Sequence, residues 1–494
     1  MRNSKTKFIK ILSLILSLTF LTCSLFGCGK DSGEMEIISD DTKYEITEKG
    51  TPLPVYAHTF DAIGGENVMP IETYYGPAPI TKESLNGVEI PYFLTDEYYS
   101  LLAEAGINVF SWSTGLKWNY DKFSVKKALD LCEKHGLAMY VDDDYLKTPR
   151  TYEEMSARLA EYKDHPAFVG LYLEDEPPAT RFADFKAINE VYAQIIDADK
   201  YPTVVNLFPN IANGYQLSGK EDETLSYEDY LLEFAKSNPG FISYDYYPFT
   251  SKDQGTTDGI SKGCFQNLSD VREVANANEI PYRIYIQAGG QWEGHIYKKS
   301  DPYHPNEGET LWNINSSIAY GVKSICYFTA IQPYQFSKAD QSEDYNRNGL
   351  LGIAGNINQW YYYIQKANKQ IQAAAPVLLH SANVGLVATG KTEGMIPVRD
   401  KLSLPWRELQ SVNGVNADTG SEVADGVMVG CFDYKGGTAL YVVNCSSTEK
   451  QKITLKFDKK YGMDVVQRAT SVGVAAKELT LTVERGEGVL VALR

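Results

Sequence analysis

The chain has 494 residues, enough for two or three domains of ordinary size, so core size is not limiting. Hydrophobic residues make up 43% and charged residues 22%, which excludes a polytopic membrane protein and a disordered chain. Lysine and arginine number 47 against 64 aspartates and glutamates. The net charge of −17 argues against nucleic acid as a partner, because binding phosphates requires a surplus of basic residues.

The first thirty residues have the pattern of an export signal. Basic residues precede an apolar run over residues 11–21, which is short for a membrane span. The sequence Leu-Phe-Gly-Cys that follows, ending at Cys28, resembles the lipobox of bacterial lipoproteins. That resemblance implies removal of residues 1–27, acylation of Cys28 and a position on the cell membrane facing outside the cytoplasm. An ordinary secretory signal with a chance cysteine is the alternative. Residues 28–60 are expected to form an acidic tether.

Eight short apolar runs follow, with starting points 30 to 41 residues apart and helical patterns between them. Thr151 and Glu154 have the spacing of a capping box, and Gly106 and Gly136 stand where helix C-caps precede strands. An α/β fold, a (β/α)8 TIM barrel, is therefore predicted over residues 61–378, with a doubly wound open sheet as the alternative. The predicted strands are Val68–Tyr74, Ile107–Trp112, Leu137–Val141, Val169–Leu173, Thr203–Leu207, Phe241–Tyr246, Tyr282–Gln287 and Val322–Thr329.

The pattern changes beyond residue 380 to short runs in which apolar and polar residues alternate. Such alternation predicts antiparallel strands with one buried face. We therefore expect a small all-β antiparallel sandwich domain over residues 379–494. Its predicted strands include Gly426–Phe432, Ala439–Asn444, Lys452–Phe457 and Glu478–Val483.

The fourth predicted barrel strand ends in three consecutive acids, Glu174, Asp175 and Glu176. Barrel enzymes keep their reactive groups at the carboxyl ends of the strands. On a regular strand, Glu174 and Glu176 would face one side and Asp175 the other. Adjacent carboxylates repel unless one stays protonated, and a carboxyl kept neutral near pH 7 is what a general acid for a glycosidic oxygen requires. A solvated acidic turn is the alternative interpretation.

The Asp-Glu-Pro at residues 175–177 resembles the Asn-Glu-Pro that ends strand 4 in clan A glycoside hydrolases. Residues 68–77 and 317–329 are similar to the barrel opening and the helix 7 to strand 8 passage of β-galactosidase-like, family 42-like members. The resemblance implies that Glu176 is the general acid/base and that Asp175 binds a sugar hydroxyl.

The end of the seventh strand departs from this family pattern. Clan A places its nucleophilic glutamate there, but this chain has Gln287, and an amide cannot form a glycosyl-enzyme ester. Three replacements stay open: Glu293 from the following loop, Asp245 at the end of the sixth strand, or the substrate's own acetamido group. The third option would fit a partial likeness to family 18 chitinases over residues 170–176, which makes Glu174 the carboxylate that holds the acetamido group.

Aromatic side chains at the strand ends suit the C–H faces of sugar rings. No metal or cofactor is expected. The histidines and cysteines show no ligand spacing. Residues 344–349 match the Asp-x-Asn-x-Asn-Gly start of a calcium-binding loop, but Gly355 stands where calcium needs a glutamate. The candidate catalytic residues are Glu176, Glu174, Asp245 and Glu293. The candidate substrate-binding residues are Asp175, Tyr74, Tyr75, Trp112, Tyr145, Tyr244, Tyr247, Gln287, Trp292 and Tyr327.

Together these features predict a cell-surface glycoside hydrolase that cleaves O-glycosidic bonds of an extracellular oligo- or polysaccharide, with Glu176 as general acid/base. One alternative is a catalytically inactive barrel that only binds glycans. Another is a family 18-like substrate-assisted N-acetylglucosaminidase. A lipoprotein that delivers sugars to a transporter is disfavoured, because eight regular βα units do not fit the two-lobed architecture of that class.

Overall fold

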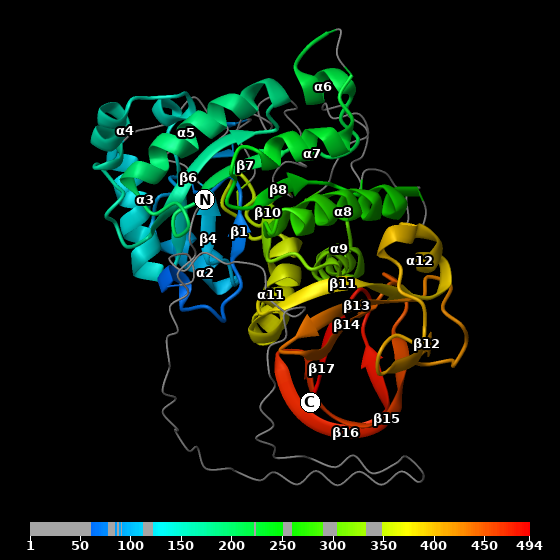
Figure 1. Ribbon diagram of the computed structural model, residues 1–494. Helices are drawn as coiled ribbons and strands as arrows, with labels where there is room; N and C mark the ends of the chain where they lie inside the picture. The colour runs from blue at the N-terminus through cyan, green and yellow to red at the C-terminus, as the bar shows by residue number, and fades with distance from the viewer. Residues whose placement is uncertain are drawn as a thin grey trace, which may run out of the picture. The chain divides into compact units, whose positions relative to one another are not determined.

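The computed structural model describes residues 61–77, 84–85, 88–89, 91–111, 122–221, 224–249, 259–289, 304–331 and 348–494. Eight parallel strands close into a barrel in chain order, because β1 pairs with both β4 and β10 (Figure 1). The predicted (β/α)8 barrel is confirmed. The strands are β1 (Ile71–Thr73), β4 (Val109–Ser111), β5 (Ala138–Asp142), β6 (Phe168–Asp175), β7 (Thr203–Leu207), β8 (Ile242–Asp245), β9 (Tyr282–Gln287) and β10 (Ser324–Phe328).

Helices connect the barrel strands, and their ends follow the predicted signals. Thr151 and Glu154 form both bonds of a capping box, and Gly106 and Gly136 have positive φ after the helices that they end. None of the helices within the described ranges is long and apolar enough to span a bilayer. They are α2 (Asp96–Glu104), α3 (Lys122–His135), α4 (Tyr152–Leu159), α5 (Phe182–Ile195), α6 (Gly214–Ser218), α7 (Tyr227–Ala235), α8 (Gly259–Ala277), α9 (Glu307–Tyr320) and α11 (Gln359–Leu378), with the 3-10 turns η2 (Asp144–Lys147) and η3 (Ala179–Arg181) and a two-stranded sheet of β2 (Ser84–Leu85) and β3 (Val88–Glu89).

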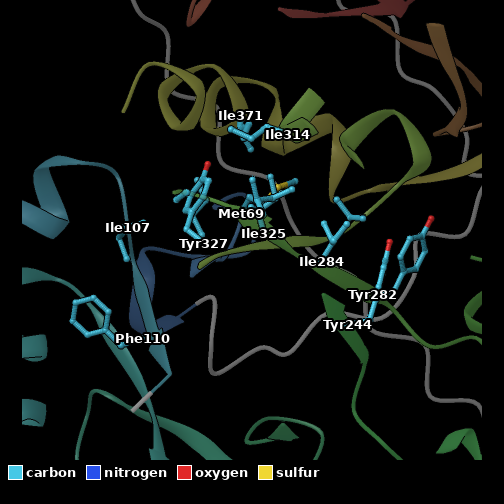
Figure 2. Close-up of a cluster of buried hydrophobic side chains, with 14 of the residues drawn as sticks. Met69, Ile107, Phe110, Tyr244, Tyr282, Ile284, Ile314, Ile325, Tyr327 and Ile371 are labelled. Atoms are coloured by element: carbon cyan, nitrogen blue, oxygen red, sulfur yellow. The ribbon is translucent and has the colours of Figure 1, made fainter. Parts of the chain in front are cut away.

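Side chains along the barrel strands alternate between the interior of the barrel and the layer beneath the helices. Inward-facing Tyr74 contacts the rings of Tyr172 and Tyr285 from two other strands, with ring centroids 5.4 and 5.5 Å away. Outward-facing Ile284 and Ile325 pack instead in the cluster that includes side chains of α9 and α11 (Figure 2). This alternation decides which strand residues can reach the mouth of the barrel.

The C-terminal strands form one antiparallel sheet, which confirms the predicted all-β domain. Strand β15 pairs with β12 along its first half and with β17 along its second half, with a register shift between Lys456 and Tyr461. Side chains from both halves of β15 belong to one apolar core. The domain is therefore a single continuous sheet that folds over on itself, and its two layers enclose that core. The strands are β11 (Ser381–Ala388), β12 (Leu409–Asn416), β13 (Val427–Tyr434), β14 (Gly437–Asn444), β15 (Gln451–Gln467), β16 (Thr470–Val483) and β17 (Gly488–Leu493); α12 (Gly390–Met395) and η5 (Val398–Asp400) lie between β11 and β12.

Strands β13, β14 and β17 are buried on both faces, whereas a single buried face was predicted. Val429 and Val442 face the core of the all-β domain, and Met428 and Tyr441 join the core of the barrel. The Tyr441 hydroxyl donates to Asn315 Oδ1 of α9 at 2.7 Å. The prediction is wrong for these strands because the barrel covers the face that would otherwise meet solvent.

Candidate active site

Three carboxyl groups gather at the carboxyl end of the barrel: Asp175 at the end of β6, Glu176 directly after it, and Asp245 at the end of β8. Asn206 of β7, the strand between them, joins all three. Its Nδ2 donates to Asp175 Oδ1 at 3.0 Å and to Asp245 Oδ1 at 3.2 Å, and its carbonyl accepts the Glu176 N–H at 2.7 Å. We refer to Asp175, Glu176 and Asp245 as the acid cluster.

Asp175 is the most heavily hydrogen-bonded member of the acid cluster. Besides the Asn206 amide, it accepts the hydroxyl of Tyr74 at 3.2 Å and that of Tyr172 at 3.3 Å. Asp175 is exposed to solvent at the mouth, but the many protein groups crowded around its carboxyl weaken its solvation and raise its pKa. The three donors oppose the rise because they stabilise the charged form.

The backbone at the end of β6 is irregular, and this places the acids differently from the prediction. The pairing of β6 with β7 shifts register between Tyr172 and Glu174, so one residue is inserted and the alternation of faces is reset. Glu174 pairs with Arg181, whose Nε donates to Glu174 Oε2 at 3.0 Å. The shift therefore turns Asp175, which stands in register with Asn206, toward the mouth, whereas Glu174 lies on the other side of the strand beside Arg181.

Glu176 itself has a left-handed backbone, with φ of +49°. Tyr75, which follows β1 at the same mouth, has φ of +51°. Residues other than glycine seldom adopt this region, and such strained positions cluster where function demands a particular side-chain placement. The hydrogen bond from the Glu176 N–H to Asn206 holds the strained turn in place.

The Glu176 carboxyl is half-buried and accepts no hydrogen bond from any residue that the structure describes. Burial, followed by the charge of neighbouring Asp175, raises its pKa to about 7. Burial, with the charges of Glu176 and Asp175, also raises the pKa of Asp245 well above its usual range, while the Asn206 amide opposes that rise. The acid cluster therefore retains a proton near neutral pH, and Glu176 has the solvent access to deliver it.

Aromatic rings surround the acid cluster at the mouth. The Tyr247 ring lies 5.3 Å from that of Phe328, and the Tyr75 and Tyr74 rings lie 5.7 and 6.1 Å from it. Burial and the charges of Asp245 and Asp175 raise the pKa of Tyr247, which places this ring beside the acids. Tyr74, Tyr75 and Tyr247 are thus brought together as the sequence predicted.

Two predicted substrate-binding tyrosines are on the wrong side of their strands. Tyr244 is fully buried in the layer beneath the helices (Figure 2). Tyr327 lies in the same layer, where its hydroxyl donates to Asn368 Oδ1 of α11 at 2.6 Å. The prediction is wrong for both, because neighbours on a strand face opposite sides and Asp245 already takes the inward position next to Tyr244.

Tyr145 lies on η2, after β5, and is 38% exposed. The Arg150 guanidinium lies 4.0 Å from its ring centroid, and Arg158 lies 5.7 Å from it. The described contacts of Tyr145 are therefore with arginines and not with the acid cluster.

Gln287, at the end of β9, is held entirely by the main chain. Its Nε2 donates to the carbonyls of Phe249 at 2.8 Å and Gly289 at 2.9 Å, and its Oε1 accepts the Phe249 N–H at 3.0 Å. No N–H of the amide is left for a substrate. Gln287 is also buried, so the structure gives it the task of joining Phe249, after β8, to Gly289, after β9, and not the predicted one of binding substrate.

Four predicted functional residues lie outside the described part of the chain: Cys28, Trp112, Trp292 and Glu293. Sequence reasoning missed Asn206, Tyr172 and Phe328. A polar residue near the end of the apolar β7 run was the available signal for Asn206. Across the described ranges, no three histidine, cysteine or acidic side chains are grouped so as to hold a metal ion.

Comparisons with known proteins identify the fold but assign no family. No family model and no curated protein matches the chain. A β-galactosidase from Bacillus circulans sp. alkalophilus is 10% identical with a TM-score of 0.56, over 86% of this chain and 99% of its own. A β-galactosidase from the psychrophilic Marinomonas ef1 is 10% identical with a TM-score of 0.43, over 62% of this chain. A β-glucuronidase from Ruminococcus gnavus is 11% identical with a TM-score of 0.39, over 61%.

The chain spans 60% of the Marinomonas protein and 48% of the Ruminococcus protein. At these identities the likeness is one of fold alone. The Bacillus structure, which is matched over nearly its whole length, shows that this fold is shared with a glycoside hydrolase.

Proposed function

We propose that the chain is a glycoside hydrolase that cleaves O-glycosidic bonds with Glu176 as general acid/base. The observation that carries this proposal is a half-buried carboxyl at the end of the fourth barrel strand, with a pKa of about 7 and two further carboxyl groups beside it. A general acid works best when its pKa lies near the operating pH. The similar fold of the β-galactosidase from Bacillus circulans supports the same reaction class.

The three acids suit different tasks in this reaction. Glu176, whose half-buried carboxyl has no hydrogen bond among the described residues, donates its proton to the leaving oxygen as the glycosidic bond breaks. Asp175, with three donors, is best stabilised in the ionised form and can balance the positive charge that develops on the sugar ring. Asp245 is the second carboxylate that we propose as nucleophile or base, and Glu293 is the sequence-based alternative.

A barrel that binds glycans without cleaving them is the second candidate. It is favoured by Gln287, because an amide held by main-chain groups stands at the end of β9. Under this alternative the acids and rings at the mouth would bind sugar hydroxyls and ring faces without passing a proton.

The test compares the wild type with Glu176→Gln on a panel of aryl-glycosides that includes galactosides and glucuronides. Glu190→Gln, an exposed position on α5, is the matched control. We expect turnover by the wild type and the control, and a ~10²–10⁴-fold lower kcat/KM in Glu176→Gln. Binding without turnover in all three proteins would support the second candidate, and wild-type turnover that survives in Glu176→Gln would refute the assignment.

We also propose that a lipid on Cys28 holds the enzyme on the outer side of the cell membrane, where it meets carbohydrate from the surroundings. The support is the lipobox-like sequence before Cys28. Labelling with a palmitate analogue in a bacterial host should mark the wild type, and Cys28→Ala should be unlabelled and leave the membrane fraction. Equal labelling of both proteins would contradict the proposal.

A further inference from the structure

A buried ion pair lies inside the barrel, and the proposed chemistry makes no direct use of it. Glu72 of β1 and Arg283 of β9 pair across the interior with side-chain exposures of only 2% and 1%. The Arg283 guanidinium also lies 4.7 Å from the ring centroid of Phe241. Burying two charges is costly, so a pair in this place calls for a role beyond stability.

Hydrogen bonds connect the ion pair to the acid cluster. Arg283 Nε donates to Ser243 Oγ at 2.9 Å, and Ser243 Oγ donates to Asn206 Oδ1 at 3.0 Å. Asn206 Nδ2 then donates to Asp175 and Asp245. We refer to Arg283, Ser243 and Asn206 as the relay.

The relay has a fixed polarity because an arginine can only donate. Arg283 occupies an acceptor site of the Ser243 oxygen, so the serine hydrogen is free to point at Asn206. The Asn206 amide must then turn its oxygen to Ser243, which leaves its NH2 group facing the two aspartates. The opposite orientation would bring the amide oxygen against two carboxylates and leave the serine proton without its acceptor.

We propose that Arg283 is a positioning residue that acts through Ser243 to orient the Asn206 amide, and thereby holds Asp175 and Asp245 in their ionised geometry. This inference rests on the proposed function, since it assigns the relay to that same active site. Neither Arg283 nor Ser243 touches the reacting groups in this scheme.

A pair of serines gives a matched test. Ser243→Ala removes the relay, whereas Ser324→Ala removes a buried hydroxyl on the other side of the same ion pair, where Ser324 Oγ donates to Glu72 Oε1 at 3.0 Å. Both changes delete one hydroxyl next to the buried charges, but only the first breaks the connection to Asn206. The other titratable groups near the aspartates are the same in both variants, so they cancel in the comparison. Within the described ranges they are Glu176, Tyr74, Tyr172, Tyr227, Tyr230, Tyr247, Tyr285, Cys326 and Lys147.

The readout is the pH profile of glycoside hydrolysis. In Ser243→Ala the Asn206 amide is no longer held with its NH2 group toward the aspartates. Its donation to them weakens and their pKa rises, so the acidic limb of kcat/KM should move up by about one pH unit. We expect kcat to fall about tenfold, with KM within about threefold of the wild type. Ser324→Ala should keep the wild-type profile, and Ser243→Thr, which restores the hydroxyl, should recover it.

Identical pH profiles for Ser243→Ala and Ser324→Ala would overturn the proposal.

If Ser243→Ala does not fold, Ser243→Cys keeps the side-chain volume but is a weaker donor. It should shift the acidic limb in the same direction by a smaller amount. If the wild type hydrolyses no glycoside, the proposed function fails, and infrared titration of the carboxyl C=O band tests the relay alone. In that measurement the pH at the midpoint of the titration of Asp175 and Asp245 should rise in Ser243→Ala and stay at the wild-type value in Ser324→Ala. Equal midpoints in the two variants would refute the relay.

Discussion

The ends of β6 and β9 occupy equivalent places in the barrel, yet their polar side chains are held in opposite ways. Gln287 after β9 is fully buried, and both of its N–H groups go to main-chain carbonyls. Glu176 after β6 is half-buried, and among the described residues only its backbone is hydrogen-bonded. The comparison teaches that a polar residue at a strand end becomes chemically useful when its backbone is fixed and its side chain is left unbonded.

The first way to break this comparison is to place a carboxyl after β9. Gln287→Glu should lower the free energy of unfolding by about 2–6 kcal/mol, because the carbonyls of Phe249 and Gly289 lose their donors and each buried loss costs about 1–3 kcal/mol. Denaturant unfolding at pH 7 measures it. We expect no gain in turnover. Stability equal to that of the wild type would show that the amide is not structural.

The second test concerns Glu176 and the pH dependence of stability. Its pKa of about 7, against an ordinary value of 4.5, means that its contribution to stability is fully present below pH 4.5 and is lost as pH rises through about 7. Glu176→Gln does not titrate, so the variant should gain up to about 3 kcal/mol relative to the wild type over that interval. Unfolding curves at several pH values measure this, with Glu190→Gln as control. A difference that stays constant with pH would contradict the raised pKa.

The third test concerns Tyr327 and Tyr244, two strand tyrosines that face away from the barrel interior. Tyr327→Phe removes the bond to Asn368 and should cost about 1–2 kcal/mol of stability. Tyr244→Phe should cost nothing or stabilise slightly, because its buried hydroxyl has no partner among the described residues. Both variants should keep the wild-type KM. A raised KM in either would return that tyrosine to the substrate site.

The fourth test concerns Glu174, where a small effect on both stability and activity is expected. Its pair with Arg181 is partly exposed, so Glu174→Gln should change stability by about 0.5–1 kcal/mol at most. Its kcat/KM should stay within a few-fold of the wild type, in contrast to Glu176→Gln two residues away. A loss similar to that of Glu176→Gln would support the substrate-assisted alternative, in which Glu174 holds the acetamido group.

Regular repetition made the barrel predictable from sequence. The predicted strands over residues 203–207 and 282–287 coincide with β7 and β9, and Thr151 caps α4 as expected. These features are local, since they depend on apolar runs and capping residues that act within a few positions. The position of Glu176 at the end of β6 followed from the same regularity.

The grouping of the site was harder to predict, because it depends on register and on which face a residue takes. The register shift within β6 moved Asp175 to the mouth and Glu174 away from it. Tyr327 was predicted at the mouth from its position at a strand end, and Tyr244 because Tyr244-Asp245 resembles the Tyr-Asp that family 18 carries at the end of strand 6. Neither prediction considered which side of the strand the side chain takes. Asn206 joins residues that are 31 and 39 positions away, and no local pattern encodes such contacts.

The central claim is that Glu176 delivers the proton to the leaving group, and its most direct test is kcat/KM against pH for glycosides with good and poor leaving groups. The wild type should lose activity above a pKa near 7. Glu176→Gln should lack that limb and lose far more activity on poor leaving groups than on good ones. A limb that persists in the variant, or an equal loss on every leaving group, would contradict the account.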